Sequence, residues 1–160
     1  MGMQGSVTVR MAAPARDVWE LVSDVTRVGE FSPETFEARW LDGTDGPRPG
    51  ARFRGHVRRN GRGPVYWTTC TVVACEPDSE FAFTVGAPGG ATIVTWRYRL
   101  ESSPDGTDVT ESFELAAMPV TRLYWAWALA GHWRLRANLG GMRLTLEKMR
   151  AVAERGAAEK

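Results

Sequence analysis

The C-terminal stretch from residue 119 to residue 155 limits the possible folds more than any other part of this sequence. After Pro119 it contains no proline and no run of turn-forming residues. Its apolar residues recur at alternating spacings of four and three, at Leu135, Leu139, Met142, Leu146, Met149 and Ala153. This spacing is typical of an amphipathic α-helix. Such a helix must bury its apolar face, and the strands that precede it are the large partner that the chain offers.

Those strands are predicted from residues that alternate between apolar and polar. The first strand is followed by one or two short helices, over residues 15–26 and 27–31, that begin after Pro14 and end before Pro33. Asn60-Gly61 is a hairpin signal, and Pro104-Asp105-Gly106 is a turn. The predicted strands cover residues 6–12, 36–41, 51–59, 65–76, 81–85, 92–100 and 109–117.

Short strands joined by turns favour an antiparallel meander. We therefore predict an α+β fold in one domain, residues 1–160, with a seven-stranded antiparallel sheet curled around the last helix. The chain is 43% hydrophobic and 24% charged, which is ordinary for a globular protein. Its net charge of +1 gives no electrostatic reason to expect a nucleic-acid partner.

The two cysteines, Cys70 and Cys75, lie five residues apart in one predicted strand. This spacing points them to opposite faces of the sheet, so we expect free thiols and a reducing, cytoplasmic location. The N-terminus lacks the basic and apolar regions of a signal peptide. The longest apolar run, residues 123–133, is too short for a transmembrane segment.

Several motifs together point to a known family; they lie at residues 13–19, 31–34, 49–55, 67, 81–83, 96–98 and 110–112. They resemble the polyketide cyclase/dehydrase-like group of the SRPBCC, or START-like, superfamily. The resemblance implies the helix-grip fold and a ligand cavity between the sheet and the last helix. The superfamily includes lipid carriers, hormone-binding proteins, aromatases and cyclases, and it has no shared catalytic signature. The resemblance therefore implies a place for the site but no catalytic residue.

Glu111 is the most informative candidate. It shares the alternation of Val109, Phe113 and Leu115, which predicts that it faces the helix. A carboxylate on an apolar face must be paired or hydrogen-bonded. Tyr98, on the same face of the preceding strand, is the nearest candidate partner. Glu111 is either a structural carboxylate, or a ligand anchor or acid/base group with a raised pKa.

Aromatic residues are the second signal, with seven tryptophans in the chain. A pocket of aromatic side chains with a few polar groups suits a flat, largely apolar ligand. The helix contributes Arg134, which can reach a ligand oxygen or remain a surface arginine. Trp125, Trp127 and Trp133 cannot all be hidden by one helical turn, so a homodimer contact is a further use for them. The predicted ligand-binding residues are Phe53, Trp67, Phe83, Trp96, Tyr98, Glu111, Phe113, Trp127, Arg134 and Leu135.

His56, His132 and the two cysteines show no metal-ligand spacing, so we predict neither a metal nor a cofactor. Our first hypothesis is a protein that binds a small hydrophobic, aromatic or polyketide-like molecule. The alternative is a polyketide cyclase, aromatase or dehydratase in which Glu111 and Tyr98 are the catalytic candidates. A third hypothesis is a regulatory interaction protein that uses a tryptophan-rich surface.

Overall fold

Seven antiparallel strands form one sheet in the order β1-β7-β6-β5-β4-β3-β2 in the computed structural model, which describes residues 3–116 and 131–160. Consecutive strands from β2 to β7 are neighbours, and β1 closes the order by pairing with β7. The predicted α+β helix-grip fold is confirmed. The strands are β1 (Gln4–Met11), β2 (Thr35–Trp40), β3 (Arg52–Arg58), β4 (Val65–Glu76), β5 (Glu80–Gly86), β6 (Thr92–Ser103) and β7 (Gly106–Leu115).

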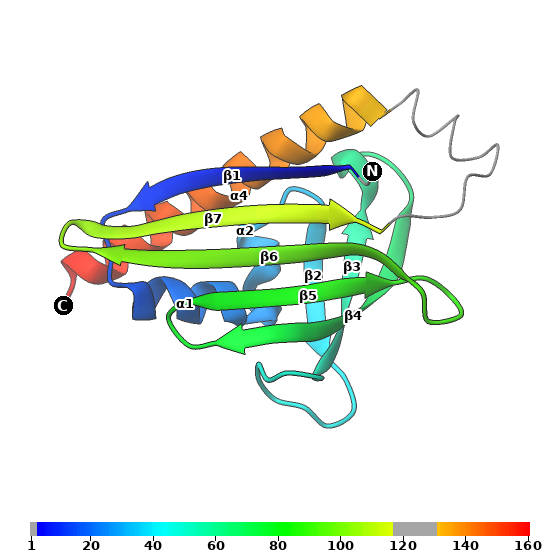
Figure 1. The fold of residues 1–160 in the computed structure, drawn as a ribbon, viewed down its shortest axis with the longest axis horizontal. Coiled ribbons are helices and arrows are strands. Elements are labelled where there is room, and N and C mark those ends of the chain that lie inside the picture. The colour runs from blue at the N-terminus through cyan, green and yellow to red at the C-terminus, as the bar shows by residue number, and fades with distance from the viewer. Residues whose placement is uncertain (1–2, 117–130) are drawn as a thin grey trace.

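The sheet is strongly curled. In Figure 1, β1, β7, β6 and β5 run side by side, whereas β2 and β3 stand nearly across them. The long hairpin of β3 and β4 carries this bend. Its six-residue connection includes the short 3₁₀ helix η2 (Arg59–Gly61), in which Gly61 has a φ of 69°. The predicted hairpin is confirmed, with a loop longer than a two-residue turn.

Three short helical segments follow β1: α1 (Ala15–Ser23), η1 (Val25–Arg27) and α2 (Val28–Phe31). Pro14 is the N-cap of α1, a position at which a backbone N–H would have no hydrogen-bond acceptor within the helix. Asp24 then separates α1 from η1 by accepting a hydrogen bond from the Thr26 N–H at 3.1 Å. The last turn stops at Ser32, directly before Pro33.

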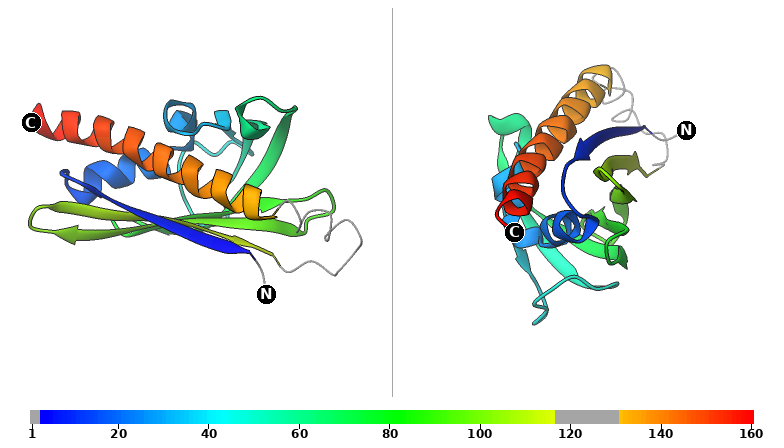
Figure 2. Two further views of the ribbon diagram at one scale, coloured as in Figure 1. Left: turned by 90° about the horizontal axis from the view of Figure 1, so that it is seen from above. Right: turned by 90° about the vertical axis from the view of Figure 1, so that its left-hand side faces the viewer.

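The C-terminal helix, α4 (Gly131–Ala158), buries the predicted apolar stripe. Met142, Leu146, Met149 and Ala153 are buried, and Leu139 is half-buried against the same core. The helix contacts β1, β7, α1 and α2. Figure 2 shows α4, α1 and α2 on the same face of the sheet. The predicted segment from residue 119 to residue 130 lies outside the described residues.

The two cysteines share the inner face of the sheet, so the predicted opposite orientation is wrong. A β-bulge between Val72 and Ala74 shifts the register of β4 against β5. Cys70 consequently pairs with Val85 and Cys75 with Phe81, two residues on one face of β5. Both cysteines are free thiols, as expected.

Candidate functional site

A cavity of about 820 Å³ lies between the inner face of the sheet, the short helices and α4. This volume is in the upper part of the range for small-molecule sites. Most of its lining is apolar because each strand turns its apolar residues to this face. The sheet contributes Phe53, Phe81, Phe83, Val85, Val94 and Trp96, and the short helices contribute Leu21, Val22, Val25, Val28 and Phe31.

Some lining residues are exposed and therefore mark where the cavity meets solvent. Tyr66 follows the β3–β4 connection and is 38% exposed, and Trp133 near the start of α4 is 80% exposed. Gly140 and Gly141 line the cavity on the helix side. A Cβ atom on Gly140 would meet nothing within 4 Å, and one on Gly141 would meet only Pro33 at 3.5 Å. The paired glycines therefore leave space beside the helix without packing against a strand.

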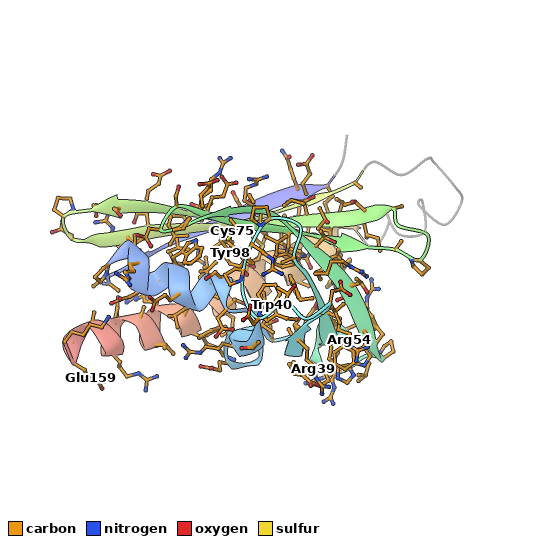
Figure 3. All side chains as sticks on the ribbon, turned by 90° about the horizontal axis from the view of Figure 1, so that it is seen from below. Arg39, Trp40, Arg54, Cys75, Tyr98 and Glu159 are labelled. Atoms are coloured by element: carbon orange, nitrogen blue, oxygen red, sulfur yellow. The ribbon has the colours of Figure 1, made fainter. Side chains whose placement is uncertain are left out.

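A buried pair of polar residues, Tyr98 and Glu111, lies deep in this site. The two are directly opposite each other on β6 and β7. The Tyr98 hydroxyl donates a hydrogen bond of 2.9 Å to Glu111 Oε1. Glu111 is only 4% exposed, as the alternation of β7 predicts, and both residues line the cavity. Figure 3 shows Tyr98 on the side of the sheet that faces the helices.

Burial favours the neutral form of this carboxyl group. It raises the pKa of Glu111 to about 8, although the hydrogen bond from Tyr98 opposes part of the shift. Burial, together with the nearby Glu111, also raises the pKa of Tyr98 well above its ordinary value. Glu111 Oε2 is enclosed and has no hydrogen-bond partner among the described residues. Glu111 is thus mostly a carboxylic acid at neutral pH, able to donate a proton or a hydrogen bond.

Eight of the ten predicted site residues divide into two groups. Phe53, Phe83, Trp96, Tyr98, Glu111 and Arg134 line the cavity. Two others form the adjoining core: the ring of Phe113 packs against Trp96, and Leu135 lies beside Gly5 of β1. Trp127 lies outside the described residues. The role of the lining residues in binding stays a prediction.

The prediction that Trp67 lines the cavity is wrong. Trp67 pairs with His56 on the outer face of the sheet, where its ring stacks on the imidazole. Its neighbours Tyr66 and Thr68 line the cavity instead. An indole is apolar enough for either face, so the residue type alone did not fix its side of β4.

Arg134 crosses from α4 to the turn before β2. Its Nη1 and Nη2 atoms lie 3.3 and 3.4 Å from the two carboxylate oxygens of Glu34. Both side chains are less than one third exposed and both line the cavity. Arg134 is therefore an ion-paired residue of the cavity rim rather than a solvated surface arginine.

Sequence reasoning missed the contribution of the short helices and of several small polar residues. Thr68, Asn138 and Thr145 line the cavity. The Thr145 hydroxyl donates to the Gly141 carbonyl within α4 at 2.9 Å, which places its methyl group and oxygen beside the glycine pair. The apolar spacing of Val22 and Val25 was the available signal for the helices.

The described residues hold no group of three or more His, Cys, Asp or Glu side chains placed to bind a metal ion. Within those residues, no helix combines the length and hydropathy needed to cross a membrane.

Residues 3–154 match the model of the protein family described as polyketide cyclase / dehydrase and lipid transport. No curated protein matches the sequence. Among solved structures, the chain is similar to the Polyketide_cyc-like protein Cgl2372 from Corynebacterium glutamicum. That match has 28% identity and a TM-score of 0.63, and it covers 95% of this chain and 92% of the other.

Two di-domain ARO/CYC proteins share the fold. BexL, from the BE-7585A biosynthetic pathway, is 23% identical with a TM-score of 0.73, over 96% of this chain and 50% of that one. StfQ, from the steffimycin pathway, is 14% identical with a TM-score of 0.76, over 99% of this chain and 52% of that one. The chain thus spans about half the length of each di-domain protein.

Proposed function

Since the chain belongs to the polyketide cyclase/dehydrase and lipid transport family, we propose that it binds a small hydrophobic molecule, aromatic or polyketide-like, between the sheet and α4. The observation that carries this proposal is the cavity of about 820 Å³, whose mostly apolar and aromatic walls include the buried, hydrogen-bonded pair Tyr98 and Glu111. Apolar walls with few polar groups are the usual construction of a site for a small organic ligand.

The shape of the walls indicates a flat ligand. Phe53 and Phe83 meet edge to face with ring centroids 5.1 Å apart, and Phe83 lies 6.0 Å from Phe81. Rings in this arrangement present both faces and edges to a bound aromatic group. The protonated Glu111 and the Tyr98 hydroxyl, deeper in the site, favour a ligand with an uncharged oxygen at its inner end, because a carboxylate there would lose its hydration without a cationic partner.

A second candidate function is a polyketide cyclase, aromatase or dehydratase. The neutral state of Glu111 favours it, since a carboxylic acid with a pKa near neutrality can serve as a general acid. Glu111 would supply a proton to a ketide carbonyl oxygen, and the Tyr98 hydroxyl would hold the carboxyl group in place. The fold shared with the ARO/CYC proteins BexL and StfQ is compatible with this function.

Two further proposals concern the location of the protein and its oligomeric state. Two free thiols are compatible with a reducing, cytoplasmic location. The exposed Trp133 is available for a homodimer contact. Sedimentation of the wild-type protein and of Trp133→Ser tests the second proposal, which predicts a dimer for the wild type alone.

One experiment separates the two candidate functions. Aromatic ketides are titrated while tryptophan fluorescence is followed, and the mixture is then analysed by mass spectrometry for products. Saturable quenching without a new product supports a binding protein. Turnover that Glu111→Gln and Tyr98→Phe abolish supports the cyclase, with Glu114→Gln, on the exposed face of the same strand, as the control. Failure of every ketide to quench or react would contradict both.

A further inference from the structure

The outer face of β2, β3 and β4 carries a cluster that the cavity does not use. We name it the Arg/Trp face and define it by Phe36, Arg39, Arg54, His56, Arg58 and Trp67. Register places Arg39 opposite Arg54 and Trp67 opposite His56, so the cluster spans three adjacent strands. Figure 3 shows Arg39 and Arg54 together at the end of the molecule remote from Glu159, the last but one residue of the chain.

The three rings of this face lie in a row and contact one another. The Trp67 and His56 rings are 4.1 Å apart and nearly parallel, at 10°. The Phe36 ring follows at 4.4 Å from His56. A register shift in β2 brings Phe36 to the outside, next to Glu37. Trp67 and Phe36 remain 39% and 44% exposed.

Arginine side chains lie over the rings. The Arg54 Cζ atom is 4.5 Å from the centre of the Trp67 ring, and Arg39 Cζ is 5.7 Å from the same ring. Arg58 Cζ is 5.6 Å from the centre of the Phe36 ring. A guanidinium group stacked in this way is held in place while its N–H edge remains available to a carboxylate. Stacking therefore reduces the side-chain conformational entropy that the arginine would lose on forming an ion pair with a partner.

The charge of the face is only partly compensated. Arg39 is bonded to Glu37 at 2.6 Å, which also lies 3.4 Å from His56. Arg54 and Arg58, in contrast, have no ion-pair partner in the part of the chain that the structure describes, residues 3–116 and 131–160. Two cationic groups on exposed aromatic rings are thus left for a partner.

Exposed tryptophan, phenylalanine and arginine, gathered here on the outer face of the sheet, are residue types that are enriched in protein interfaces. We infer that the Arg/Trp face docks a protein partner that presents a carboxylate-rich surface to Arg54 and Arg58. The rings would supply the apolar centre of the contact, and the guanidinium groups would pair with acidic side chains at its edge.

The chemistry of the face favours carboxylates of a protein over phosphates of a nucleic acid or a membrane. Phosphate-binding surfaces carry several cations that track a backbone, whereas this face leaves only Arg54 and Arg58 without an ion pair within residues 3–116 and 131–160. The Trp67 ring already stacks on His56 and its centre lies 4.5 Å from Arg54 Cζ, so a base could stack on it only by displacing one of these groups, whereas its exposed part remains available to a protein side chain.

The test uses a fluorescein-labelled peptide of alternating glutamate and leucine, followed by fluorescence anisotropy with the full chain. The double variant Arg54→Gln/Arg58→Gln is expected to weaken binding by about tenfold or more, and Trp67→Ala should also weaken it. Arg99→Gln is the matched control because it removes the same charge from an exposed position of β6 on the same side of the sheet. The control should bind as the wild type does.

Two results would overturn the inference. One is that the wild type, the double variant and Arg99→Gln bind the peptide equally well, or that none of them binds it. The other is tighter binding of a thymidine oligonucleotide or of phosphatidylglycerol vesicles than of the acidic peptide. Equal melting temperatures for all variants establish that any loss of binding is local, as expected for exposed side chains.

Discussion

The Tyr98 hydroxyl and Glu111 Oε1 are joined by a 2.9 Å hydrogen bond between directly opposed residues of β6 and β7. Both side chains are buried, so the proton that Glu111 retains is held inside a largely apolar site. This relationship connects the stability of the fold with the chemistry that the cavity can offer.

The first prediction concerns the pH dependence of stability. The pKa of Glu111 is about 8 in the folded protein, against an ordinary value of 4.5. The folded state therefore holds the proton over this interval while the unfolded state loses it, and the stabilising contribution present below pH 4.5 is lost as pH rises to 8. The expected loss is about 1.4 kcal/mol per pH unit relative to Glu111→Gln.

Urea unfolding of both proteins between pH 5 and pH 8.5 measures this difference. Glu111→Gln has no carboxyl to ionise, so its stability should exceed that of the wild type at the alkaline end. Glu114→Gln should follow the wild type, because Glu114 is exposed on the same strand. Parallel curves for wild type and Glu111→Gln would show that Glu111 is not buried as described.

The second prediction concerns Tyr98→Phe. Its hydroxyl lowers the pKa of Glu111, so removing it should raise that pKa above about 8. The loss of the buried bond should also cost roughly 1 to 2 kcal/mol of folding free energy. Carbon-13 NMR titration of the glutamate carboxyl groups measures the pKa, with Tyr66→Phe at the cavity rim as control. A fall in the pKa of Glu111 would contradict the assignment of Tyr98 as its donor.

The third prediction uses Gly140, which lines the cavity and has open space around its missing side chain. Gly140→Leu should stabilise α4 by up to about 1 kcal/mol because glycine is a poor helix former. The same leucine should occupy ligand space and weaken binding of a tricyclic anthraquinone by about tenfold. Isothermal calorimetry and thermal unfolding measure the two effects.

The matched control is Gly156→Leu, in the same helix and also without neighbours around its missing Cβ, but not in the cavity lining. It should leave anthraquinone binding unchanged. If Gly140→Leu binds the probe as tightly as the control does, the ligand does not use this side of the cavity.

The fourth prediction concerns the thiols. Burial raises the pKa of Cys70 to about 12, whereas Cys75 is partly exposed. Because the thiolate is the reactive form, Cys75 should react with a maleimide at least about tenfold faster than Cys70 in the folded protein. Mass spectrometry of Cys70→Ser and Cys75→Ser resolves the two rates. Faster labelling of Cys70 would place it outside the core.

The fold followed from the sequence because two independent periods agree. The spacing of four and three in α4 and the alternation of the strands each leave an apolar face, and the helix-grip arrangement buries both. The inward position of Glu111 was predicted by the same alternation. Its partner Tyr98 was predicted because β6 and β7 are joined by a short turn, which makes their faces correspond.

The parts that the sequence did not predict depend on local breaks in register and on residues that suit either face. The bulge at Val73 places Cys70 and Cys75 on the same face of the sheet instead of on opposite faces, and no residue type at that position predicts a bulge. Trp67 was assigned to the wrong face because an indole can line a cavity or stack under arginine equally well. The pairing of Arg134 with Glu34 joins segments a hundred residues apart.

Ligand binding in the cavity is tested most directly by NMR of the tryptophan indole N–H groups during titration with a tricyclic anthraquinone. Trp96 lines the cavity and Trp67 stacks on the outer face, so one protein contains both the probe and its control. We predict a saturable shift of the Trp96 indole signal with the Trp67 signal unchanged. A shift of Trp67 without one of Trp96, or no saturable shift of either, would contradict binding between the sheet and α4.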